Sequence, residues 1–351
     1  MKSDCRVAIT GATGFLGWHL VEAFRRADWR VTAIVRPGNR KPLPPGIEIA
    51  EAKLDPLELT RAASGATVLV HAAALVHARR EEAFRAVNVA GTEAAVAAAN
   101  TVGARIILIS SQAATGTGTP QRPSREDDPL RPLNAYGRSK VAAEAVVTSN
   151  ARTPWTIVRP SAVYGPRDRQ FLPLFRLASR GWFPQAADPA TAFTLVYVED
   201  VARAVALAAL ALTDRAGTAG GPGRAGRAVG PGRAGGVGAS GGEGRVLYLG
   251  HPQPQTTEDV LRSLAAAYQR PYRPRRIPAA FLSYLALAGE VMWRFGTEPL
   301  LDRERLAELR AEGFVCAVDR AREAIGFTAA IGLAEGVERT AKWYRKNGWT
   351  T

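Results

Sequence analysis

The chain has few cysteines, few lysines and no long hydrophobic run. Its 351 residues include two cysteines, Cys5 and Cys316, which cannot build a disulfide framework and are typical of a reducing compartment. The longest apolar stretch, residues 277–289, has 13 residues including a proline and a serine, which is too short to span a bilayer. The first residues lack the apolar core of a secretory signal. These absences predict a cytoplasmic protein without a membrane span.

The charge is strongly basic. Lys and Arg total 46 against 32 Asp and Glu, which gives a net charge of +14, and only six of the basic residues are lysine. Such an excess can mark a nucleic-acid-binding protein. The arginines are dispersed, however, and the densest cluster is only Arg273, Arg275 and Arg276. The pattern therefore favours no nucleic-acid partner.

Short apolar runs alternate with helical patterns along the first half of the chain. Strands are expected at residues 6–10, 30–35, 66–73, 105–110 and 153–158, and later at 193–198 and from residue 245. Helices are expected at residues 18–27, 56–63, 81–100, 135–149, 201–212, 257–269 and 333–346. Continuously apolar strands separated by helices predict an α/β fold, a Rossmann-type doubly wound parallel sheet with a smaller, mainly helical C-terminal substrate lobe.

Composition suggests where the domains divide. Residues 1–165, completed by 193–212, are predicted to form the Rossmann domain, residues 166–192 and 245–315 the substrate lobe, and residues 316–351 a C-terminal helical segment. Thirteen of the 34 glycines lie between Gly217 and Gly244. That tract breaks the strict Gly-X-Y repeat of collagen and holds only two prolines, so residues 213–244 are predicted to be a disordered insertion rich in Gly, Arg and Ala.

Three glycines, Gly11, Gly14 and Gly17, follow the first predicted strand and open the first predicted helix. Glycine permits the tight turn and lets backbone N–H groups approach a pyrophosphate, which the helix N-terminus favours electrostatically. Such glycines also serve plain strand–helix turns, but their position after an N-terminal strand favours dinucleotide binding.

The end of the second strand indicates which nucleotide binds. Strands that bind NAD usually end in Asp or Glu, whereas this one continues into Arg36 and Arg40, with no acid before Glu48. Guanidinium groups suit a 2′-phosphate, so NADP(H) is preferred, with NAD(H) as the alternative. Asp55 and His71 are candidates for the adenine side, or else they cap and pack.

Tyr136 and Lys140 form a YxxxK pair on a predicted helix, where residues four apart share a face. Tyrosine is a poor base near neutral pH, but a neighbouring ammonium and a cationic nicotinamide would favour the phenolate. Ser111 follows a strand at the edge where parallel sheets bind ligands, 25 residues before the tyrosine. An exposed Tyr–Lys pair would be the ordinary alternative; the glycines and Ser111 make the combination specific.

With these motifs the sequence resembles the extended short-chain dehydrogenase/reductases, the NAD-dependent epimerase/dehydratase family. The matching segments are GATGFLG (11–17), HAAA (71–74), NVAGT (88–92), ISSQAATG (109–116), YGRSK (136–140), VRPSAVYGP (158–166) and YVEDVARA (197–204). The form of the segment around Pro160 is similar to the branch that holds 3β-hydroxysteroid dehydrogenases and dihydroflavonol reductases.

The resemblance implies that Tyr136 is the general acid/base, that Lys140 lowers its pKa and holds the nicotinamide ribose, and that Ser111 bonds the reacting oxygen. Asn88 is expected to support the site or simply to start a helix, and Asp200 to be structural. The residues expected to bind the cofactor are Gly11, Thr13, Gly14, Phe15, Gly17, Arg36, Arg40, Asp55, Ala72, Ala73, Tyr136, Lys140, Pro160 and Val163. Those expected in the substrate pocket are Ala74, Gln112, Tyr164 and Trp182. The resemblance also implies a homodimer, and no metal is expected.

Departures from the family's sequence patterns exclude some of the reactions that its members catalyse. Dehydratases carry an Asp-Glu pair after the Ser/Thr, where this chain has Gln112 and Ala113. The asparagine that 4-epimerases place after the sixth strand is absent from the segment 159–162. The sequence therefore predicts an NADP(H)-preferring oxidoreductase acting between an alcohol and a ketone of a small molecule. A sugar-nucleotide epimerase or 4-ketoreductase is the alternative, and a non-catalytic NADP-binding protein a second one.

The apolar stretch Ile277 to Trp293 would either cover an apolar substrate or pack the core of the small lobe.

Overall fold

Short runs of Val, Ile, Leu and Ala form a seven-stranded parallel sheet, described here from a computed structural model that covers residues 5–217, 242–294 and 301–351. Its strands are β1 (Arg6–Thr10), β2 (Arg30–Val35), β3 (Glu48–Glu51), β4 (Val68–His71), β5 (Arg105–Ile109), β6 (Trp155–Pro160) and β11 (Gly244–Leu249). Their spatial order is β11-β6-β5-β4-β1-β2-β3. The order reverses at β1, and open parallel sheets bind ligands beyond the carboxyl ends of the strands at such a point.

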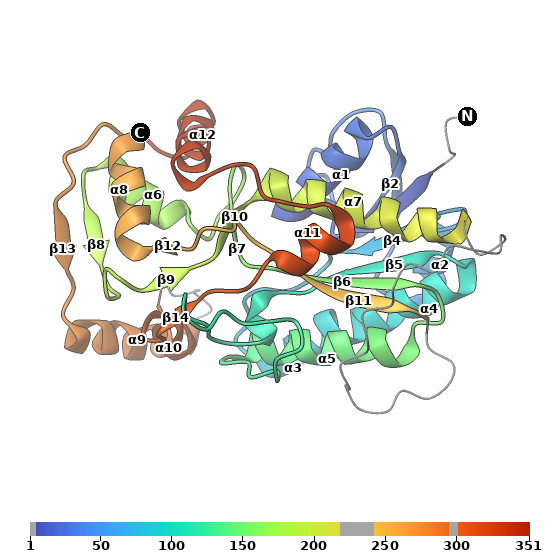
Figure 1. Cartoon of the computed structure of the whole chain (residues 1–351), viewed down its shortest axis with the longest axis horizontal. Coiled ribbons are helices and arrows are strands. Elements are labelled where there is room, and N and C mark those ends of the chain that lie inside the picture. The colour runs from blue at the N-terminus through green and yellow to red at the C-terminus, as the bar shows by residue number, and fades with distance from the viewer. Residues whose placement is uncertain (1–4, 218–241, 295–300) are drawn as a thin grey trace.

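Helices cover both faces of the sheet (Figure 1). One face carries α1 (Phe15–Arg26), α7 (Val198–Gly217) and α11 (Asp319–Ile325); the other carries α2 (Pro56–Ala62), α4 (Ala90–Val102) and α5 (Ala135–Asn150). Side chains alternate between the two sides, as a strand's period of two requires. Val7 and Ile9 lie in the core under α1 and α7, whereas Ala8 lies in the opposite core. The predicted doubly wound α/β fold is confirmed.

The smaller lobe lies beyond one end of the sheet (Figure 1). Its helices are α6 (Leu172–Ser179), α8 (Thr257–Ala267), α9 (Ala279–Arg294), α10 (Arg303–Leu309) and α12 (Leu333–Lys346). Short strands connect them: β7 (Ala162–Tyr164), β8 (Phe183–Gln185), β9 (Ala192–Phe193), β10 (Leu195–Tyr197), β12 (Gln255–Thr256), β13 (Pro274–Arg276) and β14 (Gly313–Phe314). A core of aromatic and aliphatic side chains, with Phe175, Phe183 and Tyr344 fully buried or nearly so, holds the lobe together.

Several predicted boundaries are wrong. The sequence places the strand near residue 245 in the substrate lobe, but β11 pairs with β6 and forms the edge of the main sheet. The predicted insertion 213–244 overlaps ordered elements at both ends, because α7 continues to Gly217 and β11 begins at Gly244. Residues 218–241 of that insertion lie outside the described part of the chain. The strand β3 is not predicted, because its sequence, EIAE, is polar and mostly exposed at the other edge.

The helix predicted at residues 81–100 has an irregular middle. It consists of α3 (Glu81–Phe84), a π-helical turn (Arg85–Val89) and α4. Such turns re-aim side chains and are frequent at functional sites. Here the turn carries Asn88, which is buried beneath the helix that bears the YxxxK pair.

Candidate active site

The glycine loop joins β1 to α1 and approaches the end of β4. Gly11 has a left-handed backbone, with φ of 70°, and a Cβ there would lie 2.6 Å from the Ala73 nitrogen. A Cβ on Gly17 would lie 2.0 Å from the Gly11 carbonyl oxygen. Both positions therefore require glycine. Gly14 begins α1 without a side-chain cap, and no acidic residue occupies the first turn, so the positive end of the helix is open to an anion.

The helix α5 carries Tyr136 and Lys140, and both line the same cavity as the glycine loop. Lys140 is buried, and its Nζ donates to the Ile109 carbonyl oxygen at 2.8 Å. The same Nζ lies 5.7 Å from the centre of the Tyr136 ring. Ser111 follows β5 and hydrogen-bonds to Tyr136. The three predicted catalytic residues thus converge at the carboxyl edge of the sheet.

Burial controls the ionisation of the tyrosine. Burial raises the pKa of Tyr136 to about 12, the hydrogen bond from Ser111 lowers it, and the carboxyl group of Glu308 raises it. The sequence predicted that Lys140 would lower this pKa. The pKa is raised instead, because loss of hydration on burial is the largest effect on the phenol. At neutral pH the side chain is therefore a phenol, which can donate a proton.

Burial also disfavours the ammonium of Lys140. Desolvation lowers the pKa of Lys140 to about 8, against the opposing effect of Glu144. Burial, followed by repulsion from Lys140, lowers the pKa of His71 to about 3, so this imidazole is neutral at pH 7. Its Nδ1 hydrogen-bonds to the Thr10 hydroxyl at 2.8 Å, and its Nε2 is buried without a partner among the described residues. His71 therefore packs inside the sheet.

Two further predicted residues have structural roles and do not line this cavity. The Asn88 side chain bonds the Leu75 backbone through both its oxygen and its nitrogen, and also donates to the Ser139 hydroxyl at 2.9 Å. It thereby ties the segment after β4 to α5. Asp200, in the first turn of α7, accepts from the backbone of Ala330 and Ile331, as a structural role requires.

A cavity of about 470 Å³ brings most of the predicted residues together. Its lining includes Gly11, Gly14, Phe15, Gly17, Ala72, Ala74, Ser111, Gln112, Tyr136, Lys140, Pro160 and Val163. Gln112 Nε2 and Ser161 Oγ are buried in this lining without a hydrogen-bond partner in the described parts of the chain. Buried polar atoms are normally satisfied, so both are available to a ligand.

Other predicted residues lie elsewhere. Tyr164 is buried in the lobe core against Tyr197, and Trp182 is 38% exposed at the outer end of the lobe. The structure does not place either in the cavity lining, which corrects the pocket prediction. The side chain of Asp55 caps α2, accepting from the Leu57 and Glu58 backbones, so the capping alternative describes its observed role. Ala73 donates its backbone N–H to the Thr10 hydroxyl.

The loop after β2 lies beside the glycine loop but outside the cavity lining. Asn39 Nδ2 donates to the Thr13 hydroxyl at 3.0 Å, which connects the two loops. Arg36 and Arg40, on either side of this asparagine, are exposed. Their guanidinium groups are free to approach a phosphate bound near the start of α1.

One wall of the cavity comes from α10, which the sequence did not reveal. Glu304, Arg305 and Glu308 line the cavity. The Asn134 side chain donates to Glu308, and the Ala135 backbone N–H donates to Glu304 at 3.1 Å, so α10 docks onto the start of α5. Burial raises the pKa of Glu308 to about 7. No local motif marks these residues, because they lie about 170 positions from Tyr136 along the chain.

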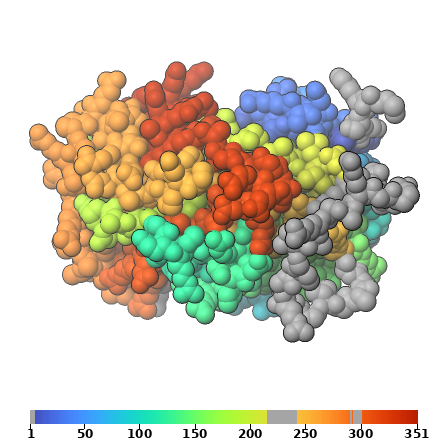
Figure 2. All heavy atoms as spheres, in the orientation of Figure 1, coloured from blue at the N-terminus to red at the C-terminus, as the bar shows by residue number. Residues whose placement is uncertain are grey.

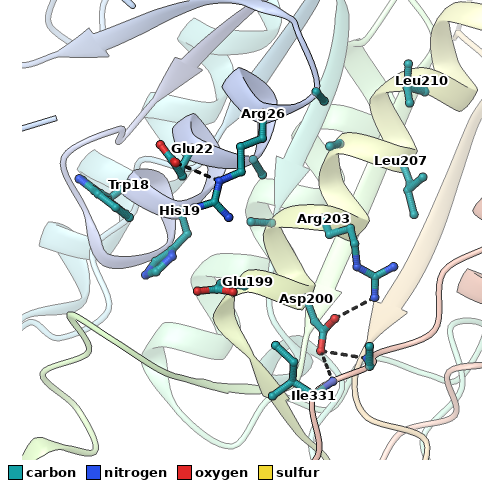
Figure 3. Close-up of a pocket in the computed structure, with 15 residues that line it drawn as sticks. Trp18, His19, Glu22, Arg26, Glu199, Asp200, Arg203, Leu207, Leu210 and Ile331 are labelled. Carbon is teal, nitrogen blue, oxygen red and sulfur yellow. Dashed lines mark hydrogen bonds and ion pairs between the residues drawn. The ribbon is translucent and has the colours of Figure 1, made fainter. Parts of the chain in front are cut away.

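A second cavity, of about 460 Å³, lies between α1 and α7 (Figure 3). Several of its polar side chains are paired with one another: Glu22 with Arg26, and Asp200 with Arg203. Burial lowers the pKa of His19 to about 4, and its Nε2 lies 3.0 Å from the Pro166 carbonyl oxygen. No pair in this lining resembles an acid/base and its activator, so we place the chemistry in the first cavity.

The residues present fit a nicotinamide dinucleotide. The uncapped start of α1 suits a pyrophosphate, and the two required glycines remove the side chains that would block it. Lys140 and the unpaired Ser161 would hold the nicotinamide end. The nicotinamide would supply a hydride. The chain would position the nicotinamide and supply the proton.

Comparison with known proteins agrees with this geometry. The model of the NAD-dependent epimerase/dehydratase family matches residues 7–218. A ceramide reductase from Caulobacter vibrioides is 41% identical over 58% of this chain and 61% of its own length, so this chain spans less than two thirds of it. A decarboxylating sterol-4-alpha-carboxylate 3-dehydrogenase from Saccharomyces cerevisiae is 26% identical over 96% of this chain and 97% of its own.

Solved structures show the same fold. The crystal structure of gox2253 superimposes with a TM-score of 0.74 and 26% identity, covering 99% of this chain and 100% of that one. The chain therefore belongs to the NAD-dependent epimerase/dehydratase family, the extended short-chain dehydrogenase/reductases, and is an NAD(P)-dependent enzyme.

Proposed function

We propose that the protein is an NADP(H)-preferring reductase that converts a ketone of an amphipathic small molecule to an alcohol, or the reverse. The observation that carries this proposal is the convergence of Ser111, Tyr136 and Lys140 with the glycine loop on one cavity. The tyrosine is protonated at neutral pH, which suits the donation of a proton to a carbonyl oxygen.

Each side chain has a part in this reaction. The hydroxyls of Ser111 and Tyr136 hold the carbonyl oxygen, and Tyr136 gives it a proton as negative charge develops there. Lys140 keeps an ammonium close to the phenol, so the phenolate left behind is stabilised. The free Nε2 of Gln112 donates a hydrogen bond to another polar group of the substrate.

The substrate class follows from the cavity lining and the relatives. Phe84, Phe193, Phe314 and Val76 make much of the lining apolar, while α10 adds charged groups to one side. The curated relatives include a ceramide reductase and a sterol dehydrogenase. An amphipathic lipid-like ketone or alcohol suits such a cavity.

A direct test is to purify the protein, add NADPH, and screen ketones for oxidation of the cofactor. We expect net NADPH consumption with at least one amphipathic ketone. Tightly bound NAD that copurifies with the protein, with no net turnover, would instead support the epimerase alternative and refute the reductase.

The exposed arginines after β2 support the choice of NADP(H). Replacing Arg36 with aspartate is expected to weaken NADPH binding by about 10- to 100-fold and to leave NADH binding within about threefold, because only NADPH has the 2′-phosphate. Fluorescence titration of both nucleotides measures this. Arg152→Asp, an exposed arginine before β6, is the charge-matched control and should change neither affinity. An equal loss for both nucleotides would refute the assignment.

The two directions of the reaction should respond differently to pH. Because burial raises the pKa of Tyr136 to about 12, the phenol persists through neutral pH. The rate of ketone reduction should therefore be nearly constant between about pH 6 and pH 8, because the phenol stays protonated. The rate of alcohol oxidation, which needs the phenolate, should rise with pH by up to about tenfold per pH unit. Initial rates of both directions test this. A rate of ketone reduction that decreases as the pH is raised from 6 to 7 would contradict this expectation.

Two other expectations from the sequence remain predictions, namely a homodimer and a cytoplasmic location. Light scattering of the purified protein measures the first. In the part of the chain that the structure describes, no helix is long and apolar enough to cross a bilayer.

A further inference from the structure

The helix α9 presents an apolar face that nothing in the described chain covers. Leu282 and Ala286 are buried against Leu306 of α10. On the remaining surface, Phe281 is 51% exposed and Leu287 is 52% exposed. Tyr284, Leu285 and Met292 are further exposed apolar side chains among the described residues of this helix. At 100° per residue, these exposed side chains fall within one arc of about 160°.

The part of α9 before Glu290 carries no charged residue. No charged residue occurs from Ile277 to Gly289, although the exposed side of a surface helix normally carries several. The apolar stretch therefore neither covers the cavity nor simply packs the lobe, the two roles that the sequence suggested. One side of α9 packs on α10, and no described residue covers the other, an arrangement typical of a face that meets a partner.

Basic residues adjoin the apolar face. The strand β13 leads directly into α9 at the outer end of the lobe (Figure 1), where Arg273, Arg275 and Arg276 are all exposed. No ion pair joins these three arginines to an acidic side chain of the described residues. Trp182, also exposed, immediately precedes β8, the partner strand of β13. The orange atoms of this region form the end of the molecule away from the sheet (Figure 2).

An apolar helix face with adjacent free arginines and an exposed tryptophan complements the surface of an anionic bilayer. Apolar side chains enter the boundary of the acyl chains, guanidinium groups meet lipid phosphates, and tryptophan favours the interface. A helix of 16 residues is about 24 Å long and, since it cannot span, would lie in the plane of the membrane.

We propose that α9 and β13 form a docking face for an anionic phospholipid bilayer, from which an amphipathic substrate passes to the cavity behind α10. The short helix α10 connects the two places, because Leu306 packs on α9 while Glu304, Arg305 and Glu308 line the cavity. The passage of substrate rests on the proposed function, whereas the docking face does not.

The test is sedimentation of the full chain with vesicles of phosphatidylcholine mixed with phosphatidylglycerol, and with phosphatidylcholine alone. We expect binding to the anionic vesicles that is weaker by about tenfold or more without phosphatidylglycerol and that falls as salt is added. Absence of binding to anionic vesicles, or equal binding to both kinds, would overturn the proposal.

Two pairs of substitutions test the face itself. Phe281→Ser with Leu287→Ser, and Arg275→Glu with Arg276→Glu, should each weaken binding to anionic vesicles by about tenfold or more. The matched controls are Leu57→Ser, at an exposed leucine of α2, and Arg122→Glu with Arg125→Glu, in an exposed loop. These controls should bind within about twofold of the original chain. Docking variants that bind like the controls would refute the assigned face.

Two further measurements distinguish bilayer docking from self-association and from catalysis. Light scattering could show an oligomer that dissociates in the variant Phe281→Ser with Leu287→Ser. If the original chain also fails to bind vesicles, the face is a contact between copies of the chain, and docking to a bilayer is refuted. Turnover of a short water-soluble ketone without vesicles should be unchanged by these substitutions. A protein that binds vesicles but reduces no ketone would refute the proposed function and leave the docking face intact.

Discussion

Replacing Tyr136 with phenylalanine is expected to lower kcat for ketone reduction by about 10²- to 10⁴-fold, the usual contribution of a positioned general acid. The ring keeps its place against Phe84, since only the hydroxyl is removed. What is lost is the proton donor that Ser111 hydrogen-bonds inside the cavity. Steady-state rates with NADPH and an amphipathic ketone measure the loss.

Tyr136→Phe should lower the rate of ketone reduction without weakening the binding of NADPH. The dissociation constant for NADPH should stay within about threefold, because the glycine loop and Lys140 are unchanged. Tyr164→Phe is the matched control: its hydroxyl lies 3.5 Å from the Gly332 carbonyl oxygen and outside the cavity lining, so kcat should hardly change. Retained activity in Tyr136→Phe would refute the assigned acid. A comparable loss in Tyr164→Phe would return that residue to the pocket.

Replacing Arg159 with methionine is expected to destabilise the fold by about 3–5 kcal/mol, because it leaves a carboxylate buried without its partner. Arg159 Nη2 lies 2.7 Å from Glu144 Oε2, and both side chains are almost completely buried. Glu144 is on α5, one turn after Lys140, and also accepts from the Ser110 hydroxyl at 2.5 Å. The pair thus ties α5 to β6 of the sheet.

Denaturant unfolding measures this effect, and two variants control it. Arg262→Met, which breaks the exposed Arg262–Glu258 pair on α8, should change the free energy of unfolding by less than about 1 kcal/mol. Arg159→Met combined with Glu144→Met should recover part of the loss, since no unpaired charge remains. If Arg159→Met destabilises no more than Arg262→Met, the buried pair does not stabilise the fold as described.

Local patterns predicted the sheet and most of the cavity. The strands β1, β2, β4 and β5 could be found because buried parallel strands are continuously apolar. The predicted glycine loop, Ser111, Tyr136 and Lys140 lie together in the structure because β1, β5 and α5 all present their ends at one edge of the sheet. The polar edge strand β3 escaped this reasoning because it is not buried.

Side-chain roles were less predictable than element positions. Tyr164 lies within a segment that matches the family, yet its ring turns into the lobe core, and Trp182 is exposed to solvent. The pKa of Tyr136 rises where its neighbour Lys140 predicted a fall, since the penalty of burial depends on everything packed around the phenol. A motif specifies which residues are near one another along the chain, and packing decides what surrounds them.

The sequence by itself determined the α/β class, the dinucleotide loop and the Tyr–Lys–Ser constellation, because each depends on residues close in the chain or on the period of a single element. Only the tertiary structure showed that β11 forms the edge of the main sheet, that Glu304 and Glu308 of α10 line the same cavity as Tyr136, and that much of the apolar stretch of α9 faces outward. These features join segments far apart in the chain. Their positions follow from how the lobe packs against the sheet, which no local pattern records.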